Sequence, residues 1–273
     1  MNNTNIHIDI DKVIQQKNPR LYSLLPGFVL SYIRKIIHQN DLNRDLQKLA
    51  PYKGAEKMRK FLEFQNITTK LQNIEHIPQS GRFIFVSNHP FGGPDGIILI
   101  ATISRFFPKI HFLVNDILMH LPDMEEIFLP INKHGRNSKE YYEIIDNAYS
   151  SDAQIIVFPA GIVSRKINGT ITDLEWQKSC VSYAKKYKRD IIPLYIHGKN
   201  SNFFYNLASL RKRLRIRANI EMFFLADELY KHNNEEITIT FGKPISYTHF
   251  TDSKKDIEWA QELKQITYAL ANK

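Results

Sequence analysis

The segment from residue 85 to residue 96, FVSNHPFGGPDG, contains the residue types best suited to chemistry. Its apolar start predicts a strand ending beside His89, and the turn that follows returns the chain with Asp95 at the start of a helix. Gly92 and Gly93 can adopt backbone angles that a Cβ would forbid, so the turn can bring the carboxylate to the imidazole. A carboxylate on one ring nitrogen supports the charge that develops when the other nitrogen takes a proton. The segment therefore predicts a general base, His89 oriented by Asp95, that acts on a hydroxyl group.

A purely structural interpretation of this segment stays open, in which Asp95 caps its helix and His89 makes one hydrogen bond within the loop. Other segments favour chemistry, because each places polar or cationic residues directly after a predicted strand. In an open α/β sheet, ligands bind at the carboxyl ends of the strands. The expected lining of one anion-binding cleft is Asn88, Lys133, Arg136, Gly161, Ser164 and Arg165, from 85–96, INKHGR (131–136) and FPAGIVSR (158–165), beside IIPLYIHG (191–198).

The elements that must position these residues follow from the hydrophobic pattern. From about residue 67, short apolar runs alternate with helical segments, which predicts an α/β fold with a mixed sheet flanked by helices. The expected strands are 82–87, 110–114, 127–131, 154–158 and 190–196, with an alternating edge strand at 236–241. The expected helices between them are 96–107, 138–149 and 173–188.

Residues 1–65 predict a helical N-terminal subdomain that packs on the α/β domain of residues 66–273. Helices are expected after Pro26, over 42–49 and over 54–64. An apolar stripe in the first of them favours packing on the main core, and a membrane-surface face is the alternative. The stripe consists of Leu25, Phe28, Val29, Tyr32 and Ile36.

The composition is that of a globular protein, with 43% hydrophobic and 24% charged residues. A single cysteine, Cys180, excludes an intramolecular disulfide and a cysteine-based zinc site. No His-rich or carboxylate-rich spacing suggests a metal. No apolar run reaches the roughly 20 residues of a membrane-spanning helix, and the polar N-terminus does not resemble a signal peptide. We therefore expect a soluble or peripheral protein in a reducing compartment, the cytoplasm, without a bound cofactor.

A formal net charge of +9 predicts an acidic partner, such as nucleic acid, anionic lipid, a phosphorylated cofactor or an acidic carrier protein. The stretch RKRLRIR, residues 211–217, places five cations in seven residues. A solvated face is one interpretation. Because Leu214 and Ile216 interleave with the cations, the stretch also suits an anionic bilayer or an acidic carrier protein. No recognised binding motif accompanies it, so nucleic acid is not expected.

The segments named above occur in the order of the four sequence blocks of the glycerolipid (lysophospholipid) acyltransferases. These blocks are Asn88-His89 with Asp95, then INK, FPAG and IIPLYIHG. The chain most resembles the bacterial hemolysin-like branch, which includes O-acyltransferases for lyso-ornithine and related aminolipids. The flanking stretches LLPGFVLSYIRKIIH, FLVNDILMHLPD and FGKPI also resemble that branch, so the likeness spans roughly residues 20 to 245.

The resemblance implies acyl transfer from a thioester, carried by acyl carrier protein or coenzyme A, to the hydroxyl of a lyso-lipid at the inner membrane surface. His89 would deprotonate that hydroxyl while Asp95 holds the imidazole, without a covalent enzyme intermediate. Backbone amides near Gly161 would stabilise the oxyanion. Lys133, assisted by Arg165, would hold an anionic group of the acceptor.

Two departures from the family pattern sharpen this expectation. Five residues separate His89 from Asp95, where four are common, and Ala160 replaces the glutamate of the usual Phe-Pro-Glu-Gly block. That glutamate is expected to contact the acceptor, so its loss predicts an acceptor other than lysophosphatidic acid, such as an N-acylated amino acid with a 3-hydroxyacyl chain. A hydrolase using the same His/Asp pair remains an alternative, although no Gly-x-Ser-x-Gly motif is present. A non-catalytic lipid- or carrier-binding protein is the other.

Overall fold

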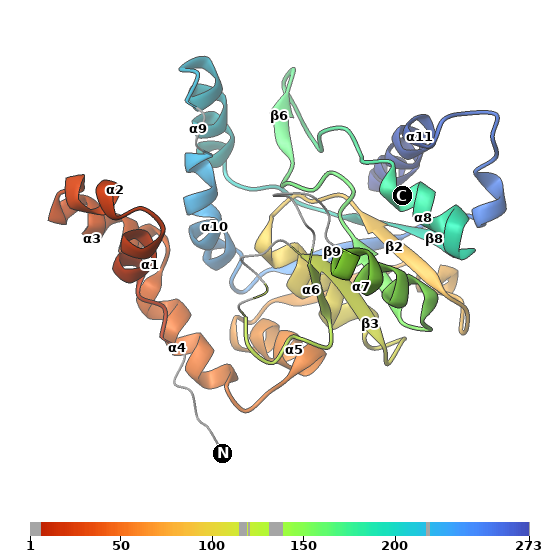
Figure 1. The fold of residues 1–273 in the computed structure, drawn as a ribbon, viewed down its shortest axis with the longest axis horizontal. Helices are drawn as coiled ribbons and strands as arrows, with labels where there is room; N and C mark the ends of the chain where they lie inside the picture. The colour runs from red at the N-terminus through yellow and green to blue at the C-terminus, as the bar shows by residue number, and fades with distance from the viewer. Residues whose placement is uncertain (1–6, 115–118, 120, 131–138, 217–218, 273) are drawn as a thin grey trace.

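A mixed seven-stranded sheet lies at the centre of the computed structural model, which describes residues 7–114, 119, 121–130, 139–216 and 219–272 (Figure 1). From β8 to β4 the strands run parallel, whereas β9 pairs antiparallel with β8 and parallel with β1. The predicted α/β class is therefore confirmed. In spatial order the strands are β1 (Thr68–Gln72), β9 (Glu236–Phe241), β8 (Asp190–Ile196), β2 (Phe83–Ser87), β5 (Gln154–Val157), β3 (Ile110–Val114) and β4 (Phe128–Pro130).

The predicted edge strand at 236–241 is wrong in its position, because β9 lies inside the sheet and β1 forms the edge beside it. The alternation of isoleucine and threonine in β9 suggested one solvent-facing side. Thr240 is nevertheless completely buried, and its hydroxyl is hydrogen-bonded to both Gln72 and His197. The true edge, β1, has the polar sequence TTKLQ, which carries too few apolar residues for the pattern to predict a strand.

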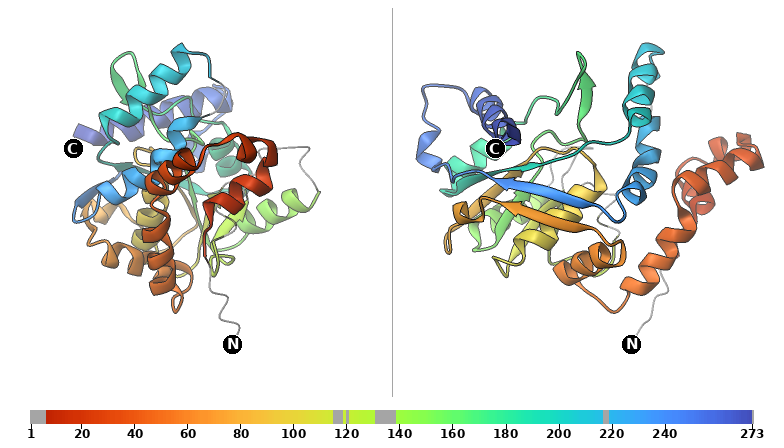
Figure 2. Two further views of the ribbon diagram at one scale, coloured as in Figure 1. Left: turned by 90° about the vertical axis from the view of Figure 1, so that its left-hand side faces the viewer. Right: turned by 180° about the vertical axis from the view of Figure 1, so that it is seen from behind.

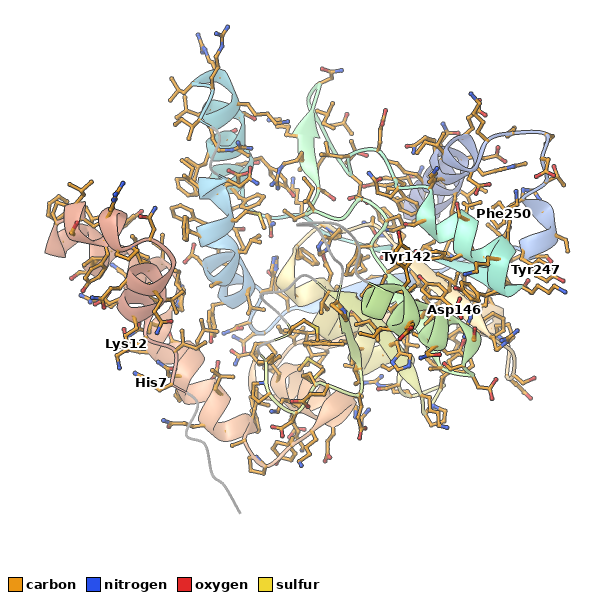
Figure 3. All side chains as sticks on the ribbon, in the orientation of Figure 1. His7, Lys12, Tyr142, Asp146, Tyr247 and Phe250 are labelled. Carbon is orange, nitrogen blue, oxygen red and sulfur yellow. The ribbon has the colours of Figure 1, made fainter. Side chains whose placement is uncertain are left out.

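Alternate residues of the central strands enter two separate cores. Phe85 and Ile156 face the first core, whereas Ile84 and Ile155 face the second. The helices α5 (Gly54–Phe64) and α6 (Gly93–Ile103) cover the first face, and α7 (Lys139–Ser150), α8 (Ser179–Tyr187) and α11 (Asp256–Ala269) cover the second. Phe250, labelled in Figure 3, extends the second core and packs edge-on against Trp259 of α11. Burial on both faces explains why these strands are apolar without interruption.

The predicted helix over 173–188 begins only at Ser179. The chain before it forms a short hairpin of β6 (Arg165–Ile167) and β7 (Thr170–Thr172). Asn168 and Gly169 connect these strands with φ values of 48° and 85°, as expected for a tight Asn-Gly hairpin turn. The hairpin projects from the sheet beside α9 (Asn202–Arg213), a helix that the pattern did not predict (Figure 1).

The N-terminal helices α1 (Ile10–Lys17), α2 (Pro19–Leu24), α3 (Gly27–Ile36) and α4 (Gln39–Leu49) extend away from the sheet, as Figures 1 and 2 show. The expected packing of the α3 stripe on the main core is wrong for Phe28 and Tyr32, which are 75% and 54% exposed. By contrast, α5 packs on α6 and adds Met58 and Phe61 to the first core. The domain boundary at residue 65 stays a prediction.

None of the helices in the described part of the chain combines the length and the apolar character needed to cross a membrane.

Candidate active site

Asn88 fixes the end of β2, from which the chain reaches His89. Its side-chain amide donates to the carbonyl of Ile196 at 2.9 Å, and its carbonyl oxygen accepts the Ile196 N–H at 2.8 Å. Both polar atoms of this buried side chain are therefore used to join β2 to β8. The predicted substrate contact of Asn88 is not seen, because the amide has turned to the neighbouring strand.

The predicted contact between His89 and Asp95 is present. The Nδ1–H of His89 donates to Asp95 Oδ2 at 2.7 Å, and the same oxygen accepts the N–H groups of Phe91 and Gly92 at 2.9 Å each. Gly92 has φ of 93°, and a Cβ there would lie only 3.1 Å from a methyl carbon of Leu225. The extra residue in the turn is thus absorbed by a glycine, and the imidazole still reaches its carboxylate.

The environment of Asp95 is suited to supporting a positive charge on the imidazole. Its side chain is completely buried, and this burial raises the pKa of Asp95, while the hydrogen bonds from His89, Gly92 and Phe91 oppose the shift. The His89 ring stacks on Phe158, with ring centroids 4.0 Å apart and planes inclined by 10°. With Nδ1 held and one ring face covered, the Nε2 edge is the part of the ring left for a substrate.

A cavity of about 620 Å³ opens at His89. The amino end of α6 forms part of its wall through Gly93 and Pro94, which brings the positive end of the helix dipole to the cleft. The opposite wall comes from the 3-10 helix η3 (Ile220–Phe224) and from α10 (Leu225–Lys231). Of the predicted site residues that the structure describes, His89 and Gly161 line this cavity.

Gly161 lies in the turn after β5 with φ of 68°, a backbone angle that favours glycine. Its N–H donates to the carbonyl of Phe158 at 2.9 Å. The amide of Gly161 itself is therefore committed to the turn and does not point to an oxyanion. Ala160, at the position of the family glutamate, packs among the apolar residues of the second core.

Arg165 is buried outside the cleft lining, and so its predicted contact with substrate is not seen. Its guanidinium pairs with Glu221 at 3.1 Å, and Glu221 also pairs with Arg211 at 2.8 Å. Burial lowers the pKa of Arg165, and the carboxylate of Glu221 opposes this. Arg211 is only 9% exposed, so within the stretch 211–217 this cation is not available to a membrane or a partner protein.

Ser164 is also buried away from the cleft lining, and its predicted contact with substrate is not seen. Its hydroxyl donates to Asp173 Oδ1 at 2.5 Å. Sequence reasoning missed both Asp173 and Glu221. The Asn168-Gly169 turn could have predicted the chain reversal that returns Asp173 to Ser164, whereas no local signal marks Glu221 as the partner of Arg165.

Lys133 and Arg136 lie outside the described residues, so their roles stay predictions. His197 donates to or accepts from the Thr240 hydroxyl at 2.8 Å. Within the described residues no group of three or more His, Cys, Asp or Glu side chains is arranged to hold a metal ion.

Comparison with known proteins adds three findings. A family model described as acyltransferase matches residues 12–273. The lyso-glycine lipid O-acyltransferase of Bacteroides thetaiotaomicron is 41% identical over 264 residues, covering 96% of this chain and 97% of the relative. The lyso-glycine lipid O-acyltransferase of Phocaeicola vulgatus is 39% identical, covering 96% and 95%.

The fold is similar to that of a solved enzyme. The crystal structure of the 1-acyl-sn-glycerophosphate (LPA) acyltransferase PlsC from Thermotoga maritima matches with a TM-score of 0.51 and 16% identity, over 96% of this chain and 92% of that one. At this identity the likeness concerns the fold alone. Taken with the family model and the two relatives, which span almost the whole chain, the sequence belongs to the acyltransferase family and the protein is an acyltransferase enzyme.

Proposed function

We propose that this enzyme transfers a fatty acyl group from an acyl thioester to the hydroxyl of a lyso-aminolipid, with a lyso-glycine lipid as acceptor. The names and identities of the two bacterial relatives support this substrate class. The observation that carries the chemistry is the 2.7 Å contact between His89 Nδ1 and Asp95 at the wall of the cleft. It supplies a base for a hydroxyl nucleophile and requires no enzyme nucleophile.

In the proposed reaction, Nε2 of His89 takes the proton of the acceptor hydroxyl as its oxygen attacks the thioester carbonyl carbon. Asp95 stabilises the resulting imidazolium through Nδ1. The tetrahedral oxyanion then collapses, the carbon–sulfur bond breaks, and the imidazolium returns its proton to the departing thiolate. The products are an ester and a free thiol. The positive end of the α6 dipole at Gly93 and Pro94 favours the oxyanion.

The lining of the cleft fits acyl chains. Beside the main cavity lies a smaller one of about 220 Å³, enclosed by α4, α5 and α6. Two charged residues line it, and both have partners. Lys57 is paired with Asp123 at 2.7 Å, and Asp45 accepts hydrogen bonds from Gln65 and Tyr230 at 2.8 Å each. We assign this space to the end of an acyl chain whose carbonyl lies near His89. The two cavities share Gly93, Gly96, Phe112 and Leu229.

The proposed acceptor carries a carboxylate, so a cation is needed near the cleft mouth. Lys133 and Arg136 remain the candidates, with Lys133 the first to test. The apolar surroundings of Ala160 argue against the acceptor contact that the family glutamate would make there.

Ala160 is 9% exposed and offers no polar atom on its side chain. A glutamate at this point would have to place its charge against the second core. This supports an acceptor that is recognised without that carboxylate, and lysophosphatidic acid is therefore a poor candidate.

The proposed site of membrane contact consists of the exposed apolar ends of α2–α3 and α9. Leu24 is 77%, Phe28 75% and Leu214 60% exposed. Lys212, Arg213 and Arg215 surround Leu214, and anionic headgroups attract such cations. Figures 1 and 2 show that the N-terminal helices and α9 both project beyond the sheet. We propose peripheral association at the cytoplasmic surface of the inner membrane.

Flotation with phosphatidylglycerol vesicles tests this surface. The Leu214→Asp variant is expected to float less than the wild type, because it places a negative charge among the cations. Ile257→Asp is the control, since Ile257 is an exposed residue of α11 on a different part of the fold. Equal flotation of all three proteins would contradict the proposed surface.

The function is tested with radiolabelled palmitoyl-acyl carrier protein or palmitoyl-coenzyme A as donor. N-(3-hydroxypalmitoyl)glycine and lysophosphatidic acid serve as competing acceptors, and products are identified by chromatography and mass. The proposal expects a diacylated glycine lipid, absent with His89→Ala and present with His249→Ala, which changes a half-exposed histidine outside the cleft lining. The donor that gives product identifies the carrier.

Two results would contradict acyl transfer itself, and a third would contradict only the choice of acceptor. Release of free palmitate without ester formation would indicate that the His/Asp pair activates water, as in a hydrolase. Lipid binding without turnover with either donor would indicate a binding protein. Preferential acylation of lysophosphatidic acid would overturn the choice of acceptor while leaving acyl transfer intact.

A further inference from the structure

Asp173, directly after β7, is a completely buried carboxylate beside the main chain of His89. Its Oδ1 accepts the His89 N–H at 3.2 Å and the Ser164 hydroxyl at 2.5 Å. Its Oδ2 accepts the indole N–H of Trp176 at 2.9 Å. A buried carboxylate is costly unless its oxygens are satisfied, and here neutral donors satisfy both.

The carbonyl of His89 is held by the same group of residues. It accepts the N–H of Ser164 at 2.7 Å, and the Ser164 hydroxyl lies 3.1 Å from it. Both polar groups of the His89 main chain are thus bound to Ser164 and Asp173. Together with the Nδ1 contact to Asp95, these bonds fix the residue from its backbone and from its ring.

Asp173 is itself anchored by the last helix of the fold. Its own N–H donates to the hydroxyl of Tyr268 at 2.7 Å, and Lys264 donates to its carbonyl at 2.6 Å. Trp176, which donates to its Oδ2, is completely buried in the second core. The support of His89 therefore reaches from the cleft through the hairpin to α11, outside the four sequence blocks.

We propose that Asp173 is a positioning residue for catalysis, which holds the His89 main chain so that Nε2 meets the acceptor hydroxyl. The inference rests on the proposed function, in which His89 is the base. Asp173 touches no substrate, because it lies outside the cleft lining. Ser164, predicted from the sequence as a substrate contact, acts in this scheme as the link between the carboxylate and the His89 carbonyl.

The shape of the Asp173 cluster supplies a matched pair of variants. Asp173→Asn removes the charge and weakens the bond to the His89 N–H. Trp176→Phe removes a partner of the other carboxylate oxygen and leaves the bonds to His89 and Ser164 in place. If the cluster were purely structural, both changes would affect kcat alike. If Asp173 positions His89, only Asp173→Asn should lower kcat.

The experiment measures kcat and KM for the acceptor, with thermal unfolding as a check of folding. Asp173→Asn is expected to lower kcat about 10- to 100-fold at unchanged KM, as a small misplacement of a catalytic group does. Trp176→Phe is expected to lower the unfolding temperature and leave kcat unchanged. Ser164→Ala, which keeps the main-chain bond, is expected to lower kcat less than Asp173→Asn, and it serves as the test if Asp173→Asn does not fold.

Unchanged kcat in Asp173→Asn, or equal losses of kcat in Asp173→Asn and Trp176→Phe, would overturn the inference. If Asp173→Asn does not fold and its kcat cannot be measured, an unchanged kcat in Ser164→Ala would overturn the inference. Failure of the proposed function is recognised separately, because the wild-type protein itself would then form no ester, whatever the Asp173 variants do.

Discussion

Two buried charged clusters follow the central strands, and only one of them opens on the cleft. In the first, Asp95 takes one ring nitrogen of His89 and leaves the other edge of the ring at the cavity wall. In the second, Glu221 lies between Arg165 and Arg211, and none of these three side chains lines the cavity. A charge at the end of a strand therefore serves chemistry only if its partners leave one polar atom facing the substrate.

The largest expected effect is that of His89→Ala. A positioned general base contributes about 10²- to 10⁴-fold to rate, so kcat/KM for acyl transfer should fall by this factor. The side chain is 16% exposed and lies at the cavity edge, so the unfolding temperature should change little. Steady-state kinetics and calorimetry check both statements. Retention of most of the activity would place the base elsewhere.

A smaller loss is expected for Asp95→Asn, which keeps the shape of the side chain but removes its negative charge. A hydrogen bond to a charged group contributes about 1.5–3 kcal/mol, which corresponds to a loss of kcat of about 10- to 100-fold. The double variant with His89→Ala should be no slower than His89→Ala alone, because Asp95 acts through the imidazole. Additive losses would show that Asp95 acts independently.

The second cluster should respond in stability rather than in turnover. Glu221→Gln leaves two buried arginines without a counter-charge, and breaking a buried ion pair in this way costs about 3–5 kcal/mol of unfolding free energy. Denaturant unfolding measures this loss, and kcat per folded molecule should remain near the wild-type value.

A triple variant provides the matched control for Glu221→Gln. Replacing the whole cluster, with Arg165→Met, Arg211→Met and Glu221→Leu, should recover much of the stability, since apolar residues of similar volume often replace a buried ion cluster without loss. If Glu221→Gln instead kept its stability and lost turnover, the cluster would be part of the substrate site after all.

The difference between the two clusters also explains which parts of the site and the fold could be predicted from the sequence. His89 and Asp95 were predictable because a short glycine-rich turn connects them, and local chain geometry decides whether they meet. The strands β3, β8 and β9 were predicted with their observed bounds, because near-continuous or alternating apolar runs identify strands in a covered sheet.

The direction in which a side chain points could not be predicted in the same way. Arg165 and Ser164 carried the same signal as His89, a polar residue shortly after a strand. Their partners are Glu221 and Asp173, and the first of these lies 56 residues further along the chain. Only tertiary packing decides that such a pair meets, so local pattern cannot separate a buried structural charge from one at the cleft.

The smallest effect on turnover is expected for a substitution of Met222, a residue of η3 that lines the cleft. Its accessibility can be measured by thiol labelling. Met222 is 37% exposed at the cleft, although its neighbour Glu221 is completely buried. The native Cys180 is also buried, which raises the pKa of its thiol to about 12. A thiol reagent attacks the thiolate, so the folded wild type should remain unlabelled at neutral pH.

In Met222→Cys, one thiol should react rapidly while kcat stays close to the wild-type value, because Met222 lies next to the paired cluster and takes no part in proton transfer. A non-hydrolysable acyl-thioester analogue should slow this labelling if the cleft binds the donor beside η3. Labelling at an unchanged rate with the analogue bound would separate this wall from the substrate path. The substrate would then have to reach His89 along the α6 side of the cleft alone, which is lined by Gly93 and Pro94.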